Sequence, residues 1–361
     1  MERLFTIGLE TTFYEMFWGE KRKGDWMKKV GIIGCGNIAQ VHGWVLDKMD
    51  NVVLSAVCDT DNEKARRLAE KYGDESTKIF TDWHSLCRED LDVVHICTPH
   101  YLHTPMAVEL LKQGKAVFME KPCAVSKEQL EELKEVDGQN PGRMGFCFQN
   151  RYNETTLAAE KMITEGVIGK VQGCRAFVTW RRDEGYYAGS EWKGIKEREG
   201  GGALINQSIH TLDLLLQFLG ESDRVEATVR NHHLQDCISV EDTVEAWLSF
   251  PGNKRACFYA SNGYVTDAPV ILELQGEKGR ITVTGPEITL WTETNGYQHF
   301  VYEQKAGIGK GYWGCGHEAC IVDYYRCLEE NRTFAVNLCG VENTMKTIFE
   351  IYEKGEGTWN R

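Results

Sequence analysis

The first part of the chain alternates between short apolar runs and helical patterns. Runs rich in β-branched residues, typical of buried strands, cover residues 30–33, 52–57, 93–97, 116–119 and 144–148. Between them, residues 62–72 and 105–113 carry apolar positions at a spacing near 3.6. A further helix is expected from Ser126, because Ser126 and Gln129 match a capping box. This alternation predicts a doubly wound α/β domain on a parallel sheet, over residues 27–149.

The pattern changes near Asn150. A helix is expected at 155–164 and a strand at 171–180, followed by an irregular stretch and a helix that begins after Gly202. Strand patterns then follow one another from 225 to about 302, including 243–250, 255–261, 270–274 and 280–283, and helices are expected at 317–329 and 341–354. This order predicts an α+β domain over residues 150–361 with an open, largely antiparallel sheet. The last helix is a candidate to pack back on the first domain.

Residues 1–26 are predicted to lie outside the core fold. Glu10 and Glu15 interrupt their apolar residues and no small-residue cleavage site follows, so a secretory signal is not expected. A strand pattern starts directly after Met27, as it would at a second beginning of the chain. An upstream start, an expression remnant and an amphipathic arm for oligomerisation all stay open for this leader.

Charge and composition narrow the partners. The chain has 361 residues, of which 42% are hydrophobic, enough for two cores. With 54 acidic and 41 basic residues its formal charge is −13, and no basic stripe is evident, so nucleic acid is not an expected ligand. Thirteen cysteines without a CxxC pair favour a reduced, cytoplasmic protein. No run approaches 18 apolar residues, so no membrane-spanning helix is expected.

A glycine motif, GCGNIA at residues 34–39, connects the first strand to a helical pattern. Gly34 permits a tight turn, Gly36 allows backbone to approach a pyrophosphate, and Ala39 keeps helix and strand close. An acidic residue, Asp59, ends the second strand 23 residues after Gly36, where it would take the ribose hydroxyls. A glycine turn without a ligand is the alternative. The residues predicted to hold the dinucleotide here are Gly34, Gly36, Asn37, Ile38, Ala39 and Asp59.

Two further segments follow strands of the same predicted sheet and reach its carboxyl edge, where such sheets bind ligands. The residues predicted at this edge are Thr98, Pro99, His103, Glu120 and Lys121. A Lys in a cleft can stabilise an alkoxide or, once desolvated, act as a base. A solvated strand end is the alternative for Lys121 taken alone. No Arg or Lys stands beside Asp59 to hold a 2′-phosphate, so NAD is expected rather than NADP.

The third motif is the segment GGGALINQSIHTLD, residues 200–213. If a helix starts after the glycines, Asn206, His210 and Asp213 share one face within an arc of about 60°. The surrounding apolar residues indicate that much of the helix is buried, where polar groups need partners or ligands. A satisfied core histidine is the alternative for His210.

Together, GCGNIA, EKP at 120–122 and this third motif resemble the glucose-fructose oxidoreductase, inositol dehydrogenase and rhizopine-catabolism (Gfo/Idh/MocA) family. The resemblance spans nearly the whole chain after Met27. It implies an N-terminal Rossmann domain, a C-terminal domain whose open sheet forms homodimers or homotetramers, and NAD(P)-dependent chemistry on a sugar or cyclitol hydroxyl. It also implies that Lys121 and His210 form the catalytic pair. Many members have Asp where this chain has Asn206, and an amide cannot stabilise an imidazolium as a carboxylate does.

Substrate contacts are expected from an aromatic loop, residues 180–192, and from the domain junction. Aromatic faces with polar rims suit a pyranose ring, although aromatics at an oligomer contact are the alternative. The residues predicted to line the substrate site are Lys121, Arg151, Arg182, Tyr187, Trp192, Asn206, His210 and His317. No metal is expected, because Cys315, His317 and Cys320 lack a fourth ligand and standard zinc spacing.

Three functions remain open at this point. The first is an NAD-dependent dehydrogenase of a sugar-like secondary alcohol, in which His210 removes the hydroxyl proton and Lys121 stabilises the alkoxide. The second keeps its NAD and uses transient oxidation to eliminate a glycosidic substituent. The third is a regulator that senses NAD or sugar without turnover.

Overall fold

The computed structural model describes residues 4–5, 27–302 and 316–356, which form two compact units. The parallel-sheet unit contains the described residues 27–149 and 316–341, and the antiparallel-sheet unit contains 4–5, 150–302 and 342–356. Apart from the strand Leu4–Phe5, the predicted extension over 1–26 lies outside the described residues.

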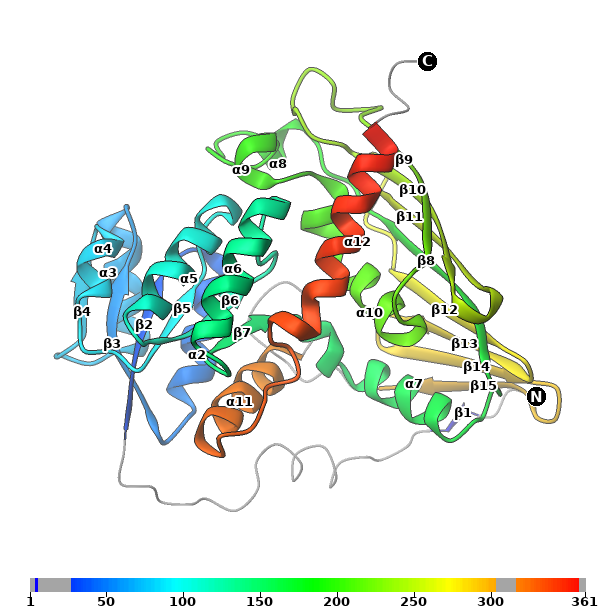
Figure 1. Cartoon of the computed structure of the whole chain (residues 1–361), viewed down its shortest axis with the longest axis horizontal. Helices are drawn as coiled ribbons and strands as arrows, with labels where there is room; N and C mark the ends of the chain where they lie inside the picture. The colour runs from blue at the N-terminus through cyan, green and yellow to red at the C-terminus, as the bar shows by residue number, and fades with distance from the viewer. Residues whose placement is uncertain (1–3, 6–26, 303–315, 357–361) are drawn as a thin grey trace. The chain divides into compact units, whose positions relative to one another are not determined.

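The parallel-sheet unit is built on six strands in the order β4-β3-β2-β5-β6-β7, and every neighbouring pair is parallel (Figure 1). The strands are β2 (Lys28–Ile33), β3 (Val52–Cys58), β4 (Lys78–Phe80), β5 (Val93–Ile96), β6 (Ala116–Glu120) and β7 (Met144–Cys147). All four residues of β5 are buried, as are all of β6 and β7, because helices cover both faces. The predicted Rossmann architecture is confirmed.

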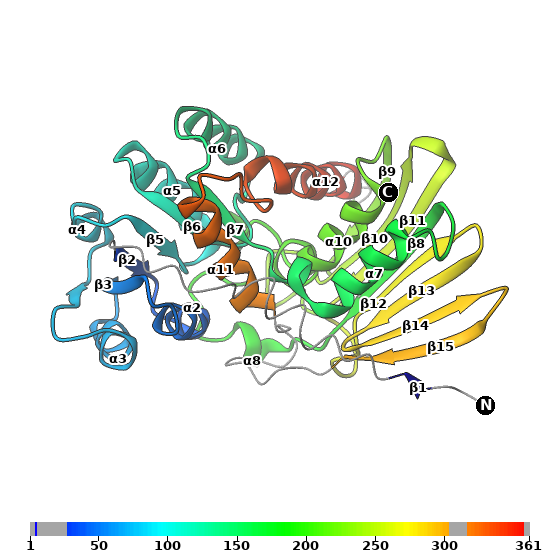
Figure 2. The same cartoon turned by 90° about the horizontal axis from the view of Figure 1, so that it is seen from below.

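Helices cover this sheet on both sides. They are α2 (Asn37–Asp47), α3 (Asn62–Tyr72), α4 (Trp83–Cys87), α5 (His103–Lys112), α6 (Lys127–Gln139) and α11 (Gly316–Glu329). Figure 2 shows α5 and α6 on one face and α2 and α3 on the other. The predicted cap of α6 is present, because Ser126 Oγ accepts a hydrogen bond from the Gln129 backbone N–H at 3.3 Å.

Helix α11 belongs to the parallel-sheet unit, although the sequence predicts one continuous second domain. It packs on α2 and β7. Its Tyr324 hydroxyl lies 3.0 Å from the Val117 carbonyl oxygen and 2.9 Å from that of Arg143, so it can donate to either. Tertiary packing of this kind leaves no sign in local periodicity.

The antiparallel-sheet unit contains a nine-stranded sheet in the order β1-β15-β14-β13-β12-β8-β11-β10-β9. The strands are β1 (Leu4–Phe5), β8 (Val171–Thr179), β9 (Arg224–Arg230), β10 (Thr243–Phe250), β11 (Lys254–Ser261), β12 (Ile271–Gly276), β13 (Gly279–Thr284), β14 (Glu287–Thr292) and β15 (Gly296–Val301). Only the β8–β11 and β1–β15 pairs are parallel. The predicted open, largely antiparallel sheet is therefore confirmed.

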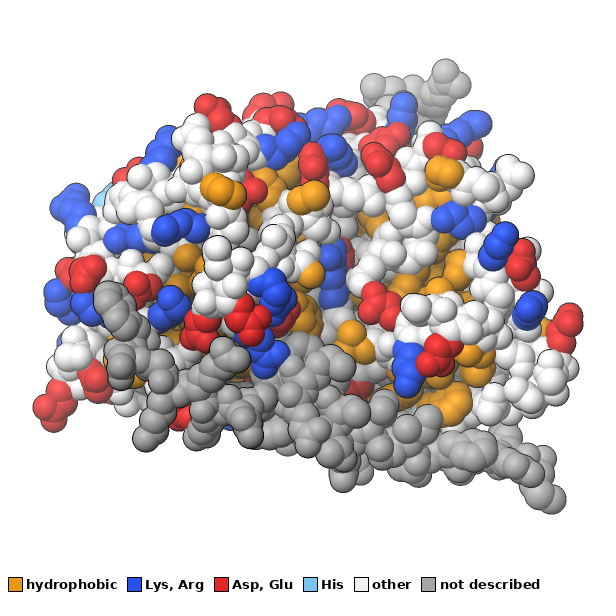
Figure 3. Space-filling model, turned by 60° about the horizontal axis from the view of Figure 1, so that its bottom comes forward, with side chains coloured by type: hydrophobic (Ala, Val, Ile, Leu, Met, Phe, Trp, Pro, Cys, Tyr) orange, Lys and Arg blue, Asp and Glu red, His pale blue; other side chains and the backbone are white. Residues whose placement is uncertain are grey.

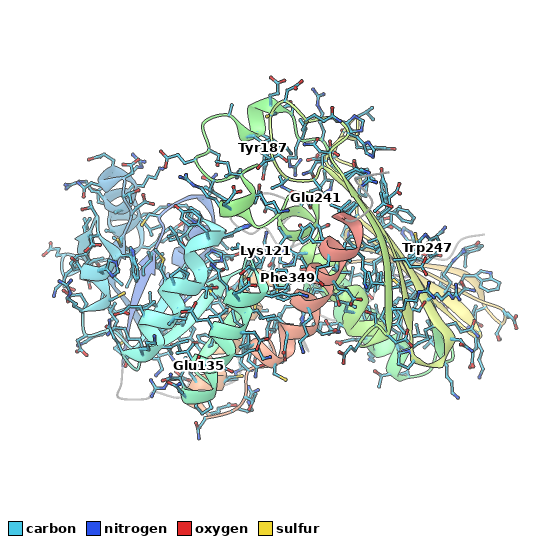
Figure 4. All side chains as sticks on the ribbon, turned by 45° about the horizontal axis from the view of Figure 1, so that its top comes forward. Lys121, Glu135, Tyr187, Glu241, Trp247 and Phe349 are labelled. Carbon is cyan, nitrogen blue, oxygen red and sulfur yellow. The ribbon has the colours of Figure 1, made fainter. Side chains whose placement is uncertain are left out.

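Helices lie along one face of this sheet. They are α7 (Glu154–Thr164), α10 (Ile209–Leu219) and α12 (Leu338–Glu356) (Figures 1 and 2). Residues 342–356 of α12 belong to this unit. Two short helices, α8 (Glu184–Tyr187) and α9 (Lys196–Glu199), lie in the irregular loop. On β10, Ala246 and Leu248 face the buried side. Trp247, labelled in Figure 4, points to the opposite face and is 61% exposed.

The expectations of reduced cysteines and of no membrane-spanning helix can be compared with the described residues. All twelve of their cysteines are free thiols, and ten of these are buried or half-buried. Among the described helices, none combines the length and apolar content needed to cross a membrane. On the face shown in Figure 3, acidic and basic side chains are interspersed over the described surface.

Candidate functional site

The glycine motif forms a backbone cradle between β2 and α2. Gly34 has φ +87°, and a Cβ atom there would lie 2.5 Å from the Cys97 carbonyl oxygen, so both conformation and space require glycine. A Cβ on Gly36 would meet nothing within 4 Å, and this residue is exposed at the N-terminus of α2. Exposed backbone at a helix N-terminus fits a dinucleotide pyrophosphate.

Asp59, at the end of β3, lies against this cradle. Its Oδ2 accepts a hydrogen bond from the Cys35 backbone N–H at 2.8 Å, and its Oδ1 accepts one from the Asp61 N–H at 2.9 Å. Asp61 in turn caps α3 through the N–H groups of Glu63 and Lys64. The predicted ribose ligand and the predicted pyrophosphate cradle are thus brought together.

His103 connects the two loops that follow β5 and β6. Its Nδ1 lies 2.7 Å from the Pro122 carbonyl oxygen and its Nε2 lies 2.8 Å from that of Thr98. Both carbonyl oxygens can only accept a hydrogen bond. Because burial lowers the pKa of His103, its ring is neutral and donates to one of the two. Through His103, the Thr98 loop is fixed beside the segment that carries half-buried Lys121, labelled in Figure 4.

A chain of four buried side chains runs inward from Glu120. His42 Nε2 lies 3.0 Å from Glu120 Oε1, and His42 Nδ1 lies 2.8 Å from His95 Nδ1. His95 Nε2 lies 2.9 Å from the hydroxyl of Tyr325 on α11. His42 and His95 are 0% exposed, so each polar atom depends on a protein partner.

If both imidazoles are neutral and Glu120 is ionised, one protonation pattern satisfies every link of this chain. Tyr325 donates its hydroxyl proton to His95 Nε2, His95 donates from Nδ1 to His42 Nδ1, and His42 donates from Nε2 to the Glu120 carboxylate. Burial lowers the pKa of His95, in agreement with a neutral ring. Burial alone would raise the pKa of Glu120, but the hydrogen bond from His42 and the electrostatic effects of His42, His317 and Lys121 together outweigh it and lower that pKa. Glu120 is therefore a carboxylate beside Lys121.

The same region contains the only cluster of possible metal ligands found among the described residues. His42, Glu120 and Cys147 offer ligand atoms within 4.8 Å of one another. The His42–Glu120 hydrogen bond already accounts for this approach. Predicted substrate residue His317 is buried in the same unit, and burial lowers its pKa to about 4. Of the Cys315, His317 and Cys320 group, Cys315 lies outside the described residues; the absence of a metal stays a prediction.

In the antiparallel-sheet unit, the glycine triplet lies against buried acidic groups. Gly200 has φ +86° and ends α9. A Cβ on Gly201 would lie 1.9 Å from the Tyr352 hydroxyl, and one on Gly202 would lie 2.0 Å from the Glu241 carbonyl oxygen. The Glu241 carboxylate accepts from the Gly202 and Leu204 N–H groups at 2.8 and 2.9 Å. Glycine is therefore required by close approach as well as by the turn.

The helix predicted to follow the triplet is interrupted. Ala203–Gln207 forms a single π-helical turn, and α10 begins only at Ile209. Ser208 causes the break, because its Oγ donates to the Ala203 carbonyl at 2.7 Å. The regular spacing assumed for the shared face does not hold across this break. Asn206 and His210 are both half-buried, but their distance from each other does not follow from an α-helical count.

Asp213 and Arg151 form an ion pair. Arg151 Nε and Nη2 donate to the two carboxylate oxygens at 2.7 and 2.6 Å, and Thr344 on α12 donates to Oδ1 at 2.7 Å. Asp213 is 1% exposed, and these contacts connect α10 to the Arg151 segment and to α12. Arg151, a predicted substrate ligand, is engaged by a protein carboxylate.

The aromatic loop is tied into the unit rather than open on all sides. The Arg182 guanidinium lies 5.1 Å from the ring centres of Trp180 and Tyr186 and pairs with Asp267 at 2.9 Å. Tyr187, labelled in Figure 4, is 5% exposed and packs with Leu234, Ile238 and Val240. Trp192 is half-buried. Contact of Arg182, Tyr187 and Trp192 with a substrate stays a prediction.

Sequence reasoning missed several polar residues around these motifs. Asn262 Nδ2 donates to the Tyr187 hydroxyl at 3.2 Å and to Gln207 Oε1 at 3.1 Å. Glu199 is buried and accepts from the Asn206 amide. Glu199 stands directly before the glycine triplet, which was the available signal. The partners of Asn262 are 75 and 55 residues away, beyond any local pattern.

The protonation pattern of the buried chain can be measured directly. Nitrogen NMR of the imidazoles should show His42 protonated at Nε2 and His95 at Nδ1, because this pattern satisfies all three links with two neutral rings and an ionised Glu120. Tyr325→Phe should shift the His95 Nε2 signal, whereas Tyr324→Phe, whose hydroxyl bonds to backbone carbonyls, should leave it unchanged. A His42 ring protonated at Nδ1 would contradict this assignment.

Comparison with known proteins gives matches in both units. The family description "Oxidoreductase family, NAD-binding Rossmann fold" fits residues 28–143, and the GFO/IDH/MocA C-terminal domain fits residues 156–282. The D-glucoside 3-dehydrogenase of Escherichia coli (strain K12) is 34% identical over 200 residues, covering 53% of this chain and 54% of that protein. The match thus spans about half the length of this relative.

Two further relatives cover more of the chain. The 2,7-anhydro-N-acetylneuraminate hydratase of Mediterraneibacter gnavus is 29% identical over 271 residues, 71% of this chain and 68% of that protein. The WlbA dehydrogenase from Bordetella pertussis, solved with NADH and UDP-GlcNAcA, superposes with a TM-score of 0.79 at 23% identity over 91% of this chain and 97% of that one. At that identity the structural likeness shows the shared fold. With both of its family domains matched, the chain belongs to the Gfo/Idh/MocA oxidoreductase family and carries an NAD-binding Rossmann domain.

Proposed function

We propose that this protein is an NAD-dependent oxidoreductase that transfers hydride between nicotinamide and a secondary hydroxyl of a sugar, glycoside or cyclitol. The observation that carries this proposal is the arrangement in the parallel-sheet unit. There the open backbone at Gly36, the Asp59 carboxylate and the Lys121 segment all lie at the carboxyl ends of parallel strands. A relative named D-glucoside 3-dehydrogenase supports the sugar as substrate class.

The residues of the cradle fit the cofactor. Backbone N–H groups at the start of α2, from Asn37, Ile38 and Ala39, would hold the pyrophosphate, and Asp59 would accept from the ribose hydroxyls. A carboxylate at this position repels a 2′-phosphate, which favours NAD over NADP. Thr98, Pro99, His103 and Glu120 would form the edge of the nicotinamide site. When bound, NAD accepts the hydride of the carbinol carbon.

The chain's own residues handle the proton and the charge. His210 takes the hydroxyl proton as the C–H and O–H bonds break and the C=O bond forms. Lys121, which follows the Glu120 carboxylate in the chain, stabilises negative charge on the oxygen. Asn206 orients the substrate or the imidazole. The proposed substrate-binding set also includes Arg151, Arg182, Tyr187, Trp192 and His317. Of these, Arg151, Arg182 and Tyr187 are held in place by the protein contacts described above.

We also propose that the protein is a cytoplasmic homodimer or homotetramer without a nucleic-acid or membrane partner. The exposed face of the antiparallel sheet supports this assembly, because Trp247 and Tyr297 are 61% and 60% exposed there.

A second candidate uses the same site for a different net reaction. One relative is named a hydratase, and hydration involves no net oxidation. In such an enzyme the sugar is oxidised only transiently, the adjacent C–H becomes acidic, a substituent is eliminated or water is added, and the ketone is reduced again. The cofactor would then stay bound and no NADH would be released.

The two candidates separate in a panel of sugars and glycosides assayed at the nicotinamide absorbance. A dehydrogenase should release one NADH for each sugar oxidised. Glycoside cleavage or hydration with no free NADH would favour the second candidate. Binding of NAD or sugar without any turnover across the panel would contradict both and favour a sensing regulator.

Lys121→Ala should lower turnover by several orders of magnitude while NAD affinity is largely kept, because the lysine acts on charge that develops in the transition state. Turnover and NAD binding should be measured on the same preparation. Lys112→Ala, on the exposed side of α5, is the matched control and should leave both unchanged. Near-normal turnover of Lys121→Ala would refute the assignment.

Asp59→Ala should reduce the preference for NAD over NADP by about 10- to 100-fold, the range for losing a charged hydrogen bond. Binding of both dinucleotides gives the ratio. Asp61→Ala removes the cap of α3 instead, so it should cost about 1 kcal/mol of stability and leave the ratio unchanged. Equal ratios in wild type and Asp59→Ala would show that Asp59 does not read the ribose.

A further inference from the structure

The geometry points to Glu199 as a positioning residue for Asn206: its carboxylate fixes which way the Asn206 amide faces, so that the amide oxygen is directed away from Glu199. This inference rests on the proposed function, in which Asn206 orients the substrate or His210. It accounts for an amide, rather than a second carboxylate, beside buried Glu199.

Glu199 is held on both carboxylate oxygens. It is 0% exposed and is the last residue of α9. Its Oε2 accepts from the Gly194 backbone N–H, and its Oε1 accepts from Asn206 Nδ2 at 2.5 Å. An ionised carboxylate can only accept hydrogen bonds, so the amide must present its nitrogen to Glu199. The amide oxygen of Asn206 then faces away from Glu199.

The burial of Glu199 makes this orientation sensitive to pH. Among the described groups, Glu241 raises the pKa of Glu199 and Lys193 lowers it, and Glu199 in turn raises the pKa of Tyr187 and of Tyr352. Burial raises the pKa of Glu199 to about 7, against the hydrogen bonds from Gly194 and Asn206, which lower it. Protonation turns one oxygen into a donor that faces an N–H donor, and the lock on the amide is lost. The carboxylate, and with it the orientation, is present above pH 7 and lost below it.

The pair also explains why aspartate does not suit position 206 in this chain. A carboxylate at 206 would lie at hydrogen-bond distance from the Glu199 carboxylate, and two buried like charges cannot both stay ionised. If residue 199 were glutamine, its amide could donate to an aspartate at 206 while its oxygen still accepted from Gly194. Residues 199 and 206 are therefore expected to work as one carboxylate and one amide, in either order.

The test exchanges the charge between the two positions. Glu199→Gln and Asn206→Asp should each lower kcat/KM on an accepted glycoside by about 10- to 100-fold, the range for one misdirected or repelled polar contact. The double variant Glu199→Gln/Asn206→Asp should recover at least tenfold over Asn206→Asp. Glu197→Gln, on the exposed side of α9, is the matched control and should behave as wild type. A double variant no better than Asn206→Asp would overturn the inference.

A second measurement needs no substrate and keeps the inference separate from the proposed function. The side-chain amide signals of Asn206 in NMR spectra of the full chain should shift between pH 6 and pH 8 in wild type and in Glu197→Gln, and stay constant in Glu199→Gln. Asn206 amide signals that are the same in wild type and in Glu199→Gln at every pH would overturn the inference. If no sugar is oxidised by wild type, the proposed function fails, and this titration alone decides whether Glu199 holds the Asn206 amide.

Discussion

Buried carboxylates persist in a folded protein only where hydrogen-bond donors replace water. In this protein each half of the proposed chemistry stands next to such a carboxylate. Glu120 is held by His42 in the parallel-sheet unit, beside Lys121. Glu199 is held by Gly194 and Asn206 in the antiparallel-sheet unit, and it precedes His210 by 11 residues in the sequence. The hydrogen bond from His42 favours a negative charge on Glu120, next to Lys121. The hydrogen bond between Asn206 and Glu199 fixes the direction of the Asn206 amide.

The two carboxylates differ in what holds them. Glu120 receives a hydrogen bond from an imidazole that is itself polarised by His95 and Tyr325, which favours the ionised form. Burial disfavours the ionised form of Glu199, its hydrogen-bond donors are neutral amides, and the nearby Glu241 carboxylate disfavours that form further. A fixed negative charge beside Lys121 and a titratable one beside Asn206 follow from these surroundings.

The sequence predicts the fold well where one face of local structure repeats. Strands such as Thr243–Phe250 alternate buried and exposed positions, and buried strands such as Val93–Ile96 read as apolar runs. Strand Lys78–Phe80 is not predicted from the sequence, because it has only three residues and none of them is buried. The break in the helix at Ser208 is not predicted either, because it depends on a side-chain hydrogen bond to Ala203 that competes with the regular helix. The site shows the same division. Gly34 and Asp59 follow from backbone geometry at fixed spacing, whereas the link between His95 and Tyr325 joins residues 230 positions apart.

The most direct test of the whole account is a crystal structure of the protein with NAD and a methyl pyranoside. The account predicts that Lys121 Nζ and a ring nitrogen of His210 both lie within hydrogen-bond reach, about 2.6–3.2 Å, of one sugar hydroxyl whose carbon faces the nicotinamide. If either nitrogen lies far from that hydroxyl, or the sugar binds away from the nicotinamide, hydride transfer by this pair is contradicted.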